Sequence, residues 1–332
     1  MPDVLTHILC AEEALQGIAK DEYKTYIDEN QRLFNLGAQG PDIFFYHDII
    51  PWKRRRHNIQ SIGRLLHSKE TGRFFIEGIK YLKNQSWERF KELFIYLSGF
   101  MCHFGLDSMA HPYIYYHGGV YNREKTETKI YRSYHKRLEI IIDTILLKEK
   151  KGIDSTAHPV YKEIDAGEKL PDAVVDFYRY ILNSIYKKTT CSVTINEAYN
   201  DMKSALKLLH DPYGIKSCIF RALGNFSREA QYINSAMYSN KIDMGYDYMN
   251  SRHIPWSHPC DKNEVYNYSF YDIFSRAVRE SRDMINASVE FIEGKIDVFA
   301  LSKYFPNISY ISGRSAEKDC KLRYYMPIFE SR

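Results

Sequence analysis

Histidine and carboxylate residues recur at helical spacing in one stretch of the sequence. His103, Asp107 and His111 stand four residues apart, and His135 and Glu139 repeat that spacing further along the chain. Residues four apart in an α-helix differ by only about 40° around its axis, so each set would share one face. Neutral imidazole and carboxylate are the ligands that zinc takes in hydrolases, and facing helices of a bundle can assemble them. The spacing therefore indicates a zinc site built between two helices.

The same residues also have a purely structural interpretation. His103 and Asp107 could form an ordinary hydrogen-bonded pair, and His135 and Glu139 could lie on a solvated helix face. Apolar neighbours such as Phe104 argue for burial of Asp107, and an unpaired buried carboxylate is costly. It needs either a cation or hydrogen-bond donors, and the pattern alone leaves both interpretations open.

Helical periodicity predicts the elements that must position these residues. Ser86 begins one helix as its cap, and the helix is expected to run until Pro112, which cannot continue it. A second helix is predicted over residues 126–150, with a buried stripe of leucine and isoleucine. Further helices are expected near residues 3–19, 171–187, 196–210, 226–240 and 269–293, and a glycine-rich loop over residues 35–41.

Strand alternation is nearly absent, and no repeat of fixed period is found. We therefore predict an all-α fold, a multi-helix bundle in which residues 1–150 form the metal-binding catalytic core. Residues 151–332 would form a C-terminal helical extension, packed into the same domain and reached through the polar segment 150–170.

Composition is that of a folded, mildly basic protein. The 332 residues are 44% hydrophobic and 27% charged, with a net charge of +4, which excludes a disordered chain. The start lacks a signal-peptide pattern and no stretch approaches eighteen apolar residues, so we expect a soluble, cytoplasmic protein without a transmembrane segment. The six cysteines are widely and irregularly spaced, which argues against a disulfide framework and against a cysteine zinc site.

The ordered set of motifs resembles the bacterial zinc-dependent phospholipase C family, whose fold is shared with the S1/P1 nucleases. The stretch from Gly99 to Pro112 resembles the family's HxxxD core helix, and Tyr134 to Asp143 its HxxxE helix. Upstream, Gly40-Pro-Asp resembles the segment with its bridging aspartate, Leu66-His67-Ser68 its next histidine, and Thr6-His7-Ile-Leu the histidine of its first helix. These matches follow the family's order over residues 1 to about 145.

The resemblance implies two or three zinc ions. The first would take Asp42, His67, His103 and Asp107. The second would take His111, His135 and Glu139 and keep a position open for water or substrate. The third would take His7 and share Asp107, and Asp42 would also be a candidate general base.

Two positions depart from the family's pattern. The second zinc's histidine commonly lies six residues after the core aspartate, whereas His111 lies four after Asp107, with His117 as the reserve candidate. The secreted relatives bind the third zinc through an exposed N-terminal Trp, which this chain lacks. Removal of Met1 to expose Pro2, or substitution by Asp3, could supply that ligand instead.

The resemblance implies hydrolysis of a phosphodiester by a metal-bound water, with a phospholipid as substrate and transient contact with a membrane surface. Basic and aromatic residues in the range 44–57 would receive the phosphate and the apolar part. Two alternatives remain at this point. One is an S1/P1-like single-strand nuclease or nucleotidase, although no nucleic-acid motif supports an obligate nucleic-acid partner. The other is a non-catalytic, metal-stabilised binding protein.

Overall fold

The computed structural model describes residues 3–49, 59–318 and 320–330, and within them the chain is almost entirely helical. The prediction of an all-α protein is confirmed. In the first half the helices are α1 (Val4–Leu15), α2 (Asp21–Glu29), α3 (Gln31–Gly37), the 3-10 helix η1 (Gly40–Tyr46), α4 (Gln60–Ser68), α5 (Thr71–Lys83), α6 (Trp87–Gly118), η2 (Thr126–Lys129) and α7 (Ile130–Lys151).

The second half continues with α8 (Val160–Glu163), α9 (Asp172–Ser184), α10 (Ser192–Leu209), α11 (Ile215–Gly224) and α12 (Arg228–Ser235). A small antiparallel hairpin follows, with strands β1 (Trp256–His258) and β2 (Asp261–Tyr266). The chain ends with α13 (Phe270–Ile292), α14 (Val298–Ser302) and the short η3 (Ile328–Glu330).

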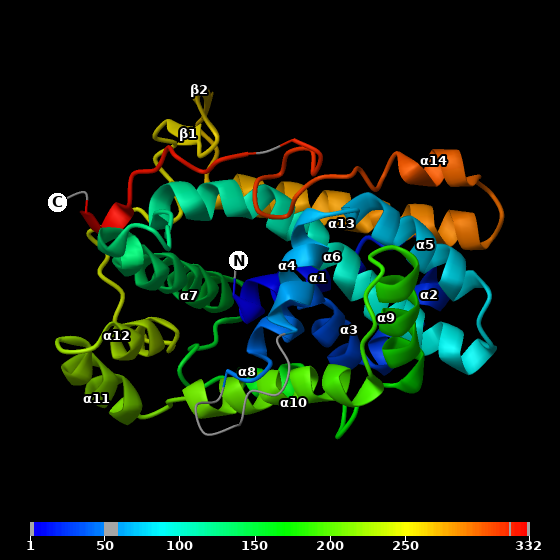
Figure 1. The fold of residues 1–332 in the computed structure, drawn as a ribbon, viewed down its shortest axis with the longest axis horizontal. Coiled ribbons are helices and arrows are strands. Elements are labelled where there is room, and N and C mark those ends of the chain that lie inside the picture. Colours follow the sequence, from blue (N-terminus) through cyan, green and yellow to red (C-terminus); the bar gives the residue numbers. More distant parts are fainter. Residues whose placement is uncertain (1–2, 50–58, 319, 331–332) are drawn as a thin grey trace.

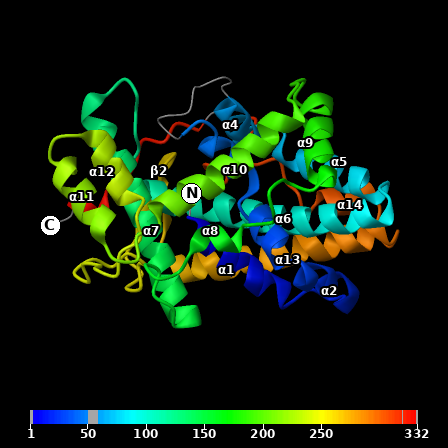
Figure 2. The same cartoon turned by 90° about the horizontal axis from the view of Figure 1, so that it is seen from below.

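Helix α6 is the central element of the fold. Helices α1, α3, α7, α9 and α13 all pack against it, and α13 runs alongside it for much of its length (Figures 1 and 2). Close crossing with α3 depends on two glycines: a Cβ on Gly37 would approach the Tyr96 carbonyl, and one on Gly99 the Phe34 carbonyl, to within 2.2 Å. One contiguous hydrophobic core extends from Val4 to Tyr310, so residues of both halves of the chain contribute to it.

The end predicted for this helix was wrong, because α6 continues through Pro112 to Gly118. Proline deprives the carbonyl four residues earlier, that of Ser108, of its helical donor. The backbone of Gly313 lies directly over this carbonyl: a Cβ there would come within 2.3 Å of the oxygen. Packing of the last turns against α7, α13 and β1 offsets the lost hydrogen bond.

Two other local predictions also need correction. The expected loop over residues 35–41 is instead the end of α3 and the start of η1, which together carry the chain into the buried interior. The expectation against disulfides is wrong as well, because Cys260 and Cys320 are bonded and tie the hairpin to the C-terminal segment.

One helix among the described residues is long and apolar enough to cross a membrane, namely α6. However, 94% of its most apolar window is buried inside the protein. That degree of burial is typical of the central helix of a folded core.

Candidate metal centre

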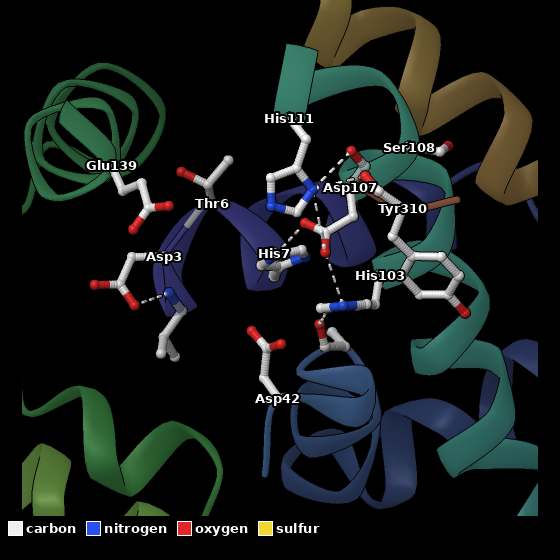
Figure 3. Close-up of polar contacts among 12 residues, drawn as sticks. Asp3, Thr6, His7, Asp42, His103, Asp107, Ser108, His111, Glu139 and Tyr310 are labelled. Atoms are coloured by element: carbon white, nitrogen blue, oxygen red, sulfur yellow. Dashed lines mark hydrogen bonds and ion pairs between the residues drawn. The ribbon is translucent and has the colours of Figure 1, made fainter. Parts of the chain in front are cut away.

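Four elements bring the predicted ligands together at the centre of the protein. Helix α1 carries His7, η1 carries Asp42, α4 carries His67, and α6 carries His103, Asp107 and His111. All six side chains are buried. Figure 3 shows the labelled members of this set pointing toward one another from α1, η1 and α6.

Asp107 is the hub of this cluster. Its Oδ1 lies 3.3 Å from Nε2 of His7, and its Oδ2 lies 3.1 Å from Nε2 of His103. Oδ2 is also 3.7 Å from Nε2 of His67 and 3.7 Å from Nδ1 of His111. His67 in turn places Nε2 at 3.1 Å from Oδ1 of Asp42. A carboxylate that faces the Nε2 atoms of three histidines is placed as a ligand shared between ions would be, whereas His111 turns its Nδ1 toward it.

Backbone carbonyls orient three of the histidine rings. Nδ1 of His67 lies 2.7 Å from the Gly63 carbonyl, and Nδ1 of His103 lies 3.1 Å from the Ala38 carbonyl. Nδ1 of His111 lies 2.7 Å from the Tyr310 carbonyl. A carbonyl can only accept, so the proton resides on Nδ1 in each ring. This leaves the unprotonated Nε2 for a metal, which is the usual arrangement around a metal-bound histidine.

Several inward-facing atoms of the cluster are buried without a hydrogen bond. They are both ring nitrogens of His7, Nε2 of His103, Oδ1 of Asp42 and both carboxylate oxygens of Asp107. Unsatisfied buried polar atoms are rare in native proteins and call for an explanation such as a bound ion. Within this cluster, two triads have ligand atoms close enough to hold a cation, His7 with His103 and Asp107, and Asp42 with His67 and His103. The residues present therefore fit a metal centre.

Electrostatics favour the protonation states that metal ligands need. Burial would raise the pKa of Asp107, but His111 and His103 beside it hold that pKa well below its ordinary value. Burial lowers the pKa of His111 and of His135. Burial of His111 and His135 thus favours the neutral imidazole, which is the form that binds a divalent ion.

His135 and Glu139 form a separate pair on α7, with Nε2 and Oε1 2.8 Å apart. The ring of Tyr115 lies between this pair and the Asp107 cluster, with centroids 4.7 Å from His135 and 5.7 Å from His111. Among the described residues, neither His135 nor Glu139 belongs to a group of three close enough to hold an ion. Their assignment with His111 to one zinc ion stays a prediction.

Lys136 was not foreseen as part of this region. Its Nζ lies 2.9 Å from Oδ2 of Asp3 and 3.4 Å from Oε2 of Glu139. Burial alone would lower the pKa of Lys136, but the two carboxylates raise it well above the ordinary value. Asp3 also accepts from the Val4 amide as the cap of α1. Asp3 is thus held near Glu139 (Figure 3), whereas Pro2 lies outside the described residues.

Asp143 anchors the helix that carries His7. Its carboxylate accepts from the backbone amides of Leu5 and Thr6, from the Thr6 hydroxyl and from the Tyr238 hydroxyl. Burial, reinforced by the charge of Asp3, raises the pKa of Asp143 to about 7. Asp143 stands four residues after Glu139 and eight after His135, so the same helical phase could have identified it from the sequence.

Tyr310, far along the chain, is the other residue that the sequence did not reveal. Its carbonyl contacts His111, its amide donates to the His67 carbonyl, and its ring packs 5.1 Å from the ring of His67. Backbone groups have no sequence signature, so no motif could have indicated this contact.

The remaining candidates lie outside the cluster. His117 is partly buried and packs against Tyr113 and Trp256, and its Nε2 has no hydrogen-bond partner. Trp256 is itself buried in β1 and is part of the core. Most of the basic and aromatic range 44–57 lies outside the described residues.

Comparison with known proteins bears on this geometry. The profile of a protein family described as zinc dependent phospholipase C matches residues 6–214, which is more than half of the chain. The match includes every predicted ligand from His7 to Glu139. No curated protein and no solved structure matches the chain significantly.

Proposed function

Because the chain belongs to the zinc-dependent phospholipase C family, we propose that it hydrolyses the phosphodiester bond of a phospholipid at the buried cluster around Asp107. The observation that carries the proposal is the set of unsatisfied ligand atoms on His7, Asp42, His103 and Asp107, which face one another in the protein's interior.

We assign the ligands as the family resemblance and the contacts suggest. Asp42, His67, His103 and Asp107 would hold one zinc ion, and His7 with Asp107 a second. His111, His135 and Glu139 would hold a further ion once Glu139 exchanges its contact with Lys136 for the metal. Zinc ions at such a site would supply an activated water and neutralise charge on the phosphoryl oxygens.

The chain's own groups divide the remaining tasks. The Asp107 side chain is fully buried, whereas 9% of the Asp42 side chain and 18% of the His135 side chain remain exposed. Asp42 is therefore more accessible than Asp107, which suits acceptance of a proton at its oxygens. The carbonyls of Gly63, Ala38 and Tyr310 fix the histidine rings, so the site needs little rearrangement to bind its ions.

The test compares substrates with one zinc-loaded preparation. Short-chain phosphatidylcholine, a chromogenic phosphodiester and single-stranded DNA are offered at equal protein concentration, with and without a chelator. We expect chelator-sensitive release of diacylglycerol and phosphocholine, and little or no DNA cleavage.

Hydrolysis of DNA alone would replace the proposal with a nuclease. Failure on all three substrates, with zinc shown to be bound, would overturn it in favour of a metal-stabilised binding protein.

A further inference from the structure

Helix α11 has an apolar face that no other part of the described chain covers. Ile215, Ile219 and Leu223 follow one another at four-residue spacing, and none of the ten residues of α11 is buried. Tyr213 precedes the helix with 87% of its surface exposed, and Phe226 follows it with 91% exposed. Contiguous exposed apolar side chains of this kind mark an interaction site.

The opposite side of α11 packs on α12 and holds the apolar face outward. The Ser217 hydroxyl donates to Asp211 and contacts the Met237 sulfur. Gly224 lies against the backbone of Gln231, where a Cβ would make an ordinary contact at 3.4 Å. Helix α11 is thus fixed on one side, which gives it a defined exposed surface.

Charged side chains within the segment that forms this face are all basic, with Asp211 before the segment and Glu229 after it. From Pro212 to Ser227 the chain contains Lys216 and Arg221 and no acidic residue, and Arg228 follows directly. A short helix with a leucine and isoleucine stripe flanked by basic residues is suited to lie in the headgroup region of an anionic membrane. A neutral protein partner would gain nothing from these cations.

The position of α11 relates this face to the candidate metal centre. Helix α12 packs on α7, which carries His135 and Glu139, and the α11–α12 pair lies at the α7 end of the molecule (Figures 1 and 2). The family match ends at residue 214, one residue before α11 begins, so the helix itself lies outside the matched region.

We propose that the exposed face of α11 docks on an anionic phospholipid surface and holds the metal centre next to its substrate. The benefit of this docking for catalysis rests on the proposed function. Docking itself depends only on the face, so binding and hydrolysis can be tested separately.

The experiment is flotation of the full chain with vesicles. One set consists of phosphatidylcholine alone, and in the other part of the phosphatidylcholine is replaced by phosphatidylglycerol. We expect binding that is stronger on the anionic vesicles and weaker at high salt. The double variant Ile219→Ser with Phe226→Ser should lose at least about tenfold in affinity, since two apolar side chains no longer insert.

Two further variants test the contribution of charge to binding and the specificity of the α11 face. Replacement of Arg221 and Arg228 by glutamine should weaken binding to anionic vesicles several-fold and leave the weaker binding to neutral vesicles unchanged. Phe299 is also strongly exposed, at 71%, but lies on α14 at the other end of the molecule. Phe299→Ser is therefore the matched control and should bind as the wild type does.

Hydrolysis of the soluble chromogenic phosphodiester should be unchanged in the α11 variants, because α11 carries no ligand. Vesicle binding without hydrolysis of any substrate would refute the proposed function and support docking. Absence of binding by the wild type, or equal binding by the serine variant, would overturn docking. Docking would also be overturned if light scattering showed that the wild type is a dimer and the serine variant a monomer. The face would then join two copies of the chain.

Discussion

Asp107 is the residue on which the account depends most. Four imidazoles lie within 3.7 Å of its two oxygens. Asp107→Asn keeps the size of the side chain but removes its charge, so it should bind at least one metal ion fewer than the wild type and lose nearly all hydrolysis. Elemental analysis of protein purified without added metal measures the first effect.

The matched control is His117→Gln, a change to a partly buried histidine that lies on the same helix but outside the cluster. It should retain the full metal content. Equal metal content in Asp107→Asn and the wild type would show that Asp107 is not a shared ligand.

The pKa of His117 leads to a separate prediction about how the stability of the protein depends on pH. Burial lowers its pKa from 6.5 to about 4, with Asp247 opposing the shift. Since the folded pKa lies below the unfolded one, the unfolded state binds the extra proton, and stability falls as pH drops from 6.5 toward about 4. The loss for this one group is roughly 2 kcal/mol between pH 6.5 and pH 5.

His117→Phe removes the titrating group and keeps a ring against Tyr113 and Trp256. Urea unfolding in chelator at the two pH values should therefore show a shallower decline than in the wild type. A parallel decline would mean that His117 is protonated or solvated in the folded protein.

The residue types at the site were predictable because a helix repeats its face every three to four residues. His103, Asp107 and His111 in phase on α6 indicated a buried polar face, and the structure brings His7, Asp42 and His67 to it. The Tyr310 carbonyl could not be predicted, because its contribution is a backbone atom positioned by tertiary packing. Ligation by the full predicted set, and a role for Asp42 as base, stay predictions.

At the scale of elements, the turn between α3 and η1 controls the position of His103. Gly40 has a φ of +51°, and a Cβ there would come within 2.4 Å of the His103 ring. Gly40→Ala should displace this ring, which lowers zinc affinity in a competition assay with a chromogenic chelator.

Gly152 is the matched control for backbone strain. It has a φ of +71° after α7, and no atom lies within 4 Å of a Cβ built there. Gly152→Ala should cost some stability and leave zinc affinity intact. If both variants bind zinc equally, the contact between η1 and His103 does not position the ligand.

Asp143 connects α7 to the start of α1 and to Tyr238. Asp143→Asn replaces an acceptor of four hydrogen bonds with a group that also carries donors, so it should destabilise the protein by about 2–3 kcal/mol. Tyr238→Phe removes one of the four and should cost about 1 kcal/mol. Chemical denaturation measures both, and the reverse order of effects would contradict the anchoring role.

Helices with a clear apolar stripe were predicted within a few residues, as for α7, α9 and α13. The end of α6 was missed because burial overrode the preference of Pro112, and η1 was missed because glycine and proline in a tight 3-10 turn resemble a loop. Short elements such as α2, α4 and α11 depend on neighbours for their stability, so local periodicity did not indicate them.

At the scale of the whole molecule, bound ions should hold the bundle together. The cluster joins α1, η1, α4 and α6 through buried imidazoles and carboxylates. Removal of the metal should lower the thermal unfolding midpoint by several degrees, because ligands that bind the folded state stabilise it. Calorimetry with chelator and after zinc is restored checks this, and an unchanged midpoint would place the ions, if any, elsewhere.

The central claim is that zinc bound around Asp107 makes this protein a phosphodiester hydrolase. The most direct test is a zinc titration of chelator-treated protein, with bound metal and hydrolysis of short-chain phosphatidylcholine measured on the same samples. We predict that hydrolysis rises in step with bound zinc in the wild type and stays near zero in Asp107→Asn at every zinc concentration. Hydrolysis that persists without zinc, or a wild type that fills its sites and remains inactive, would contradict the account.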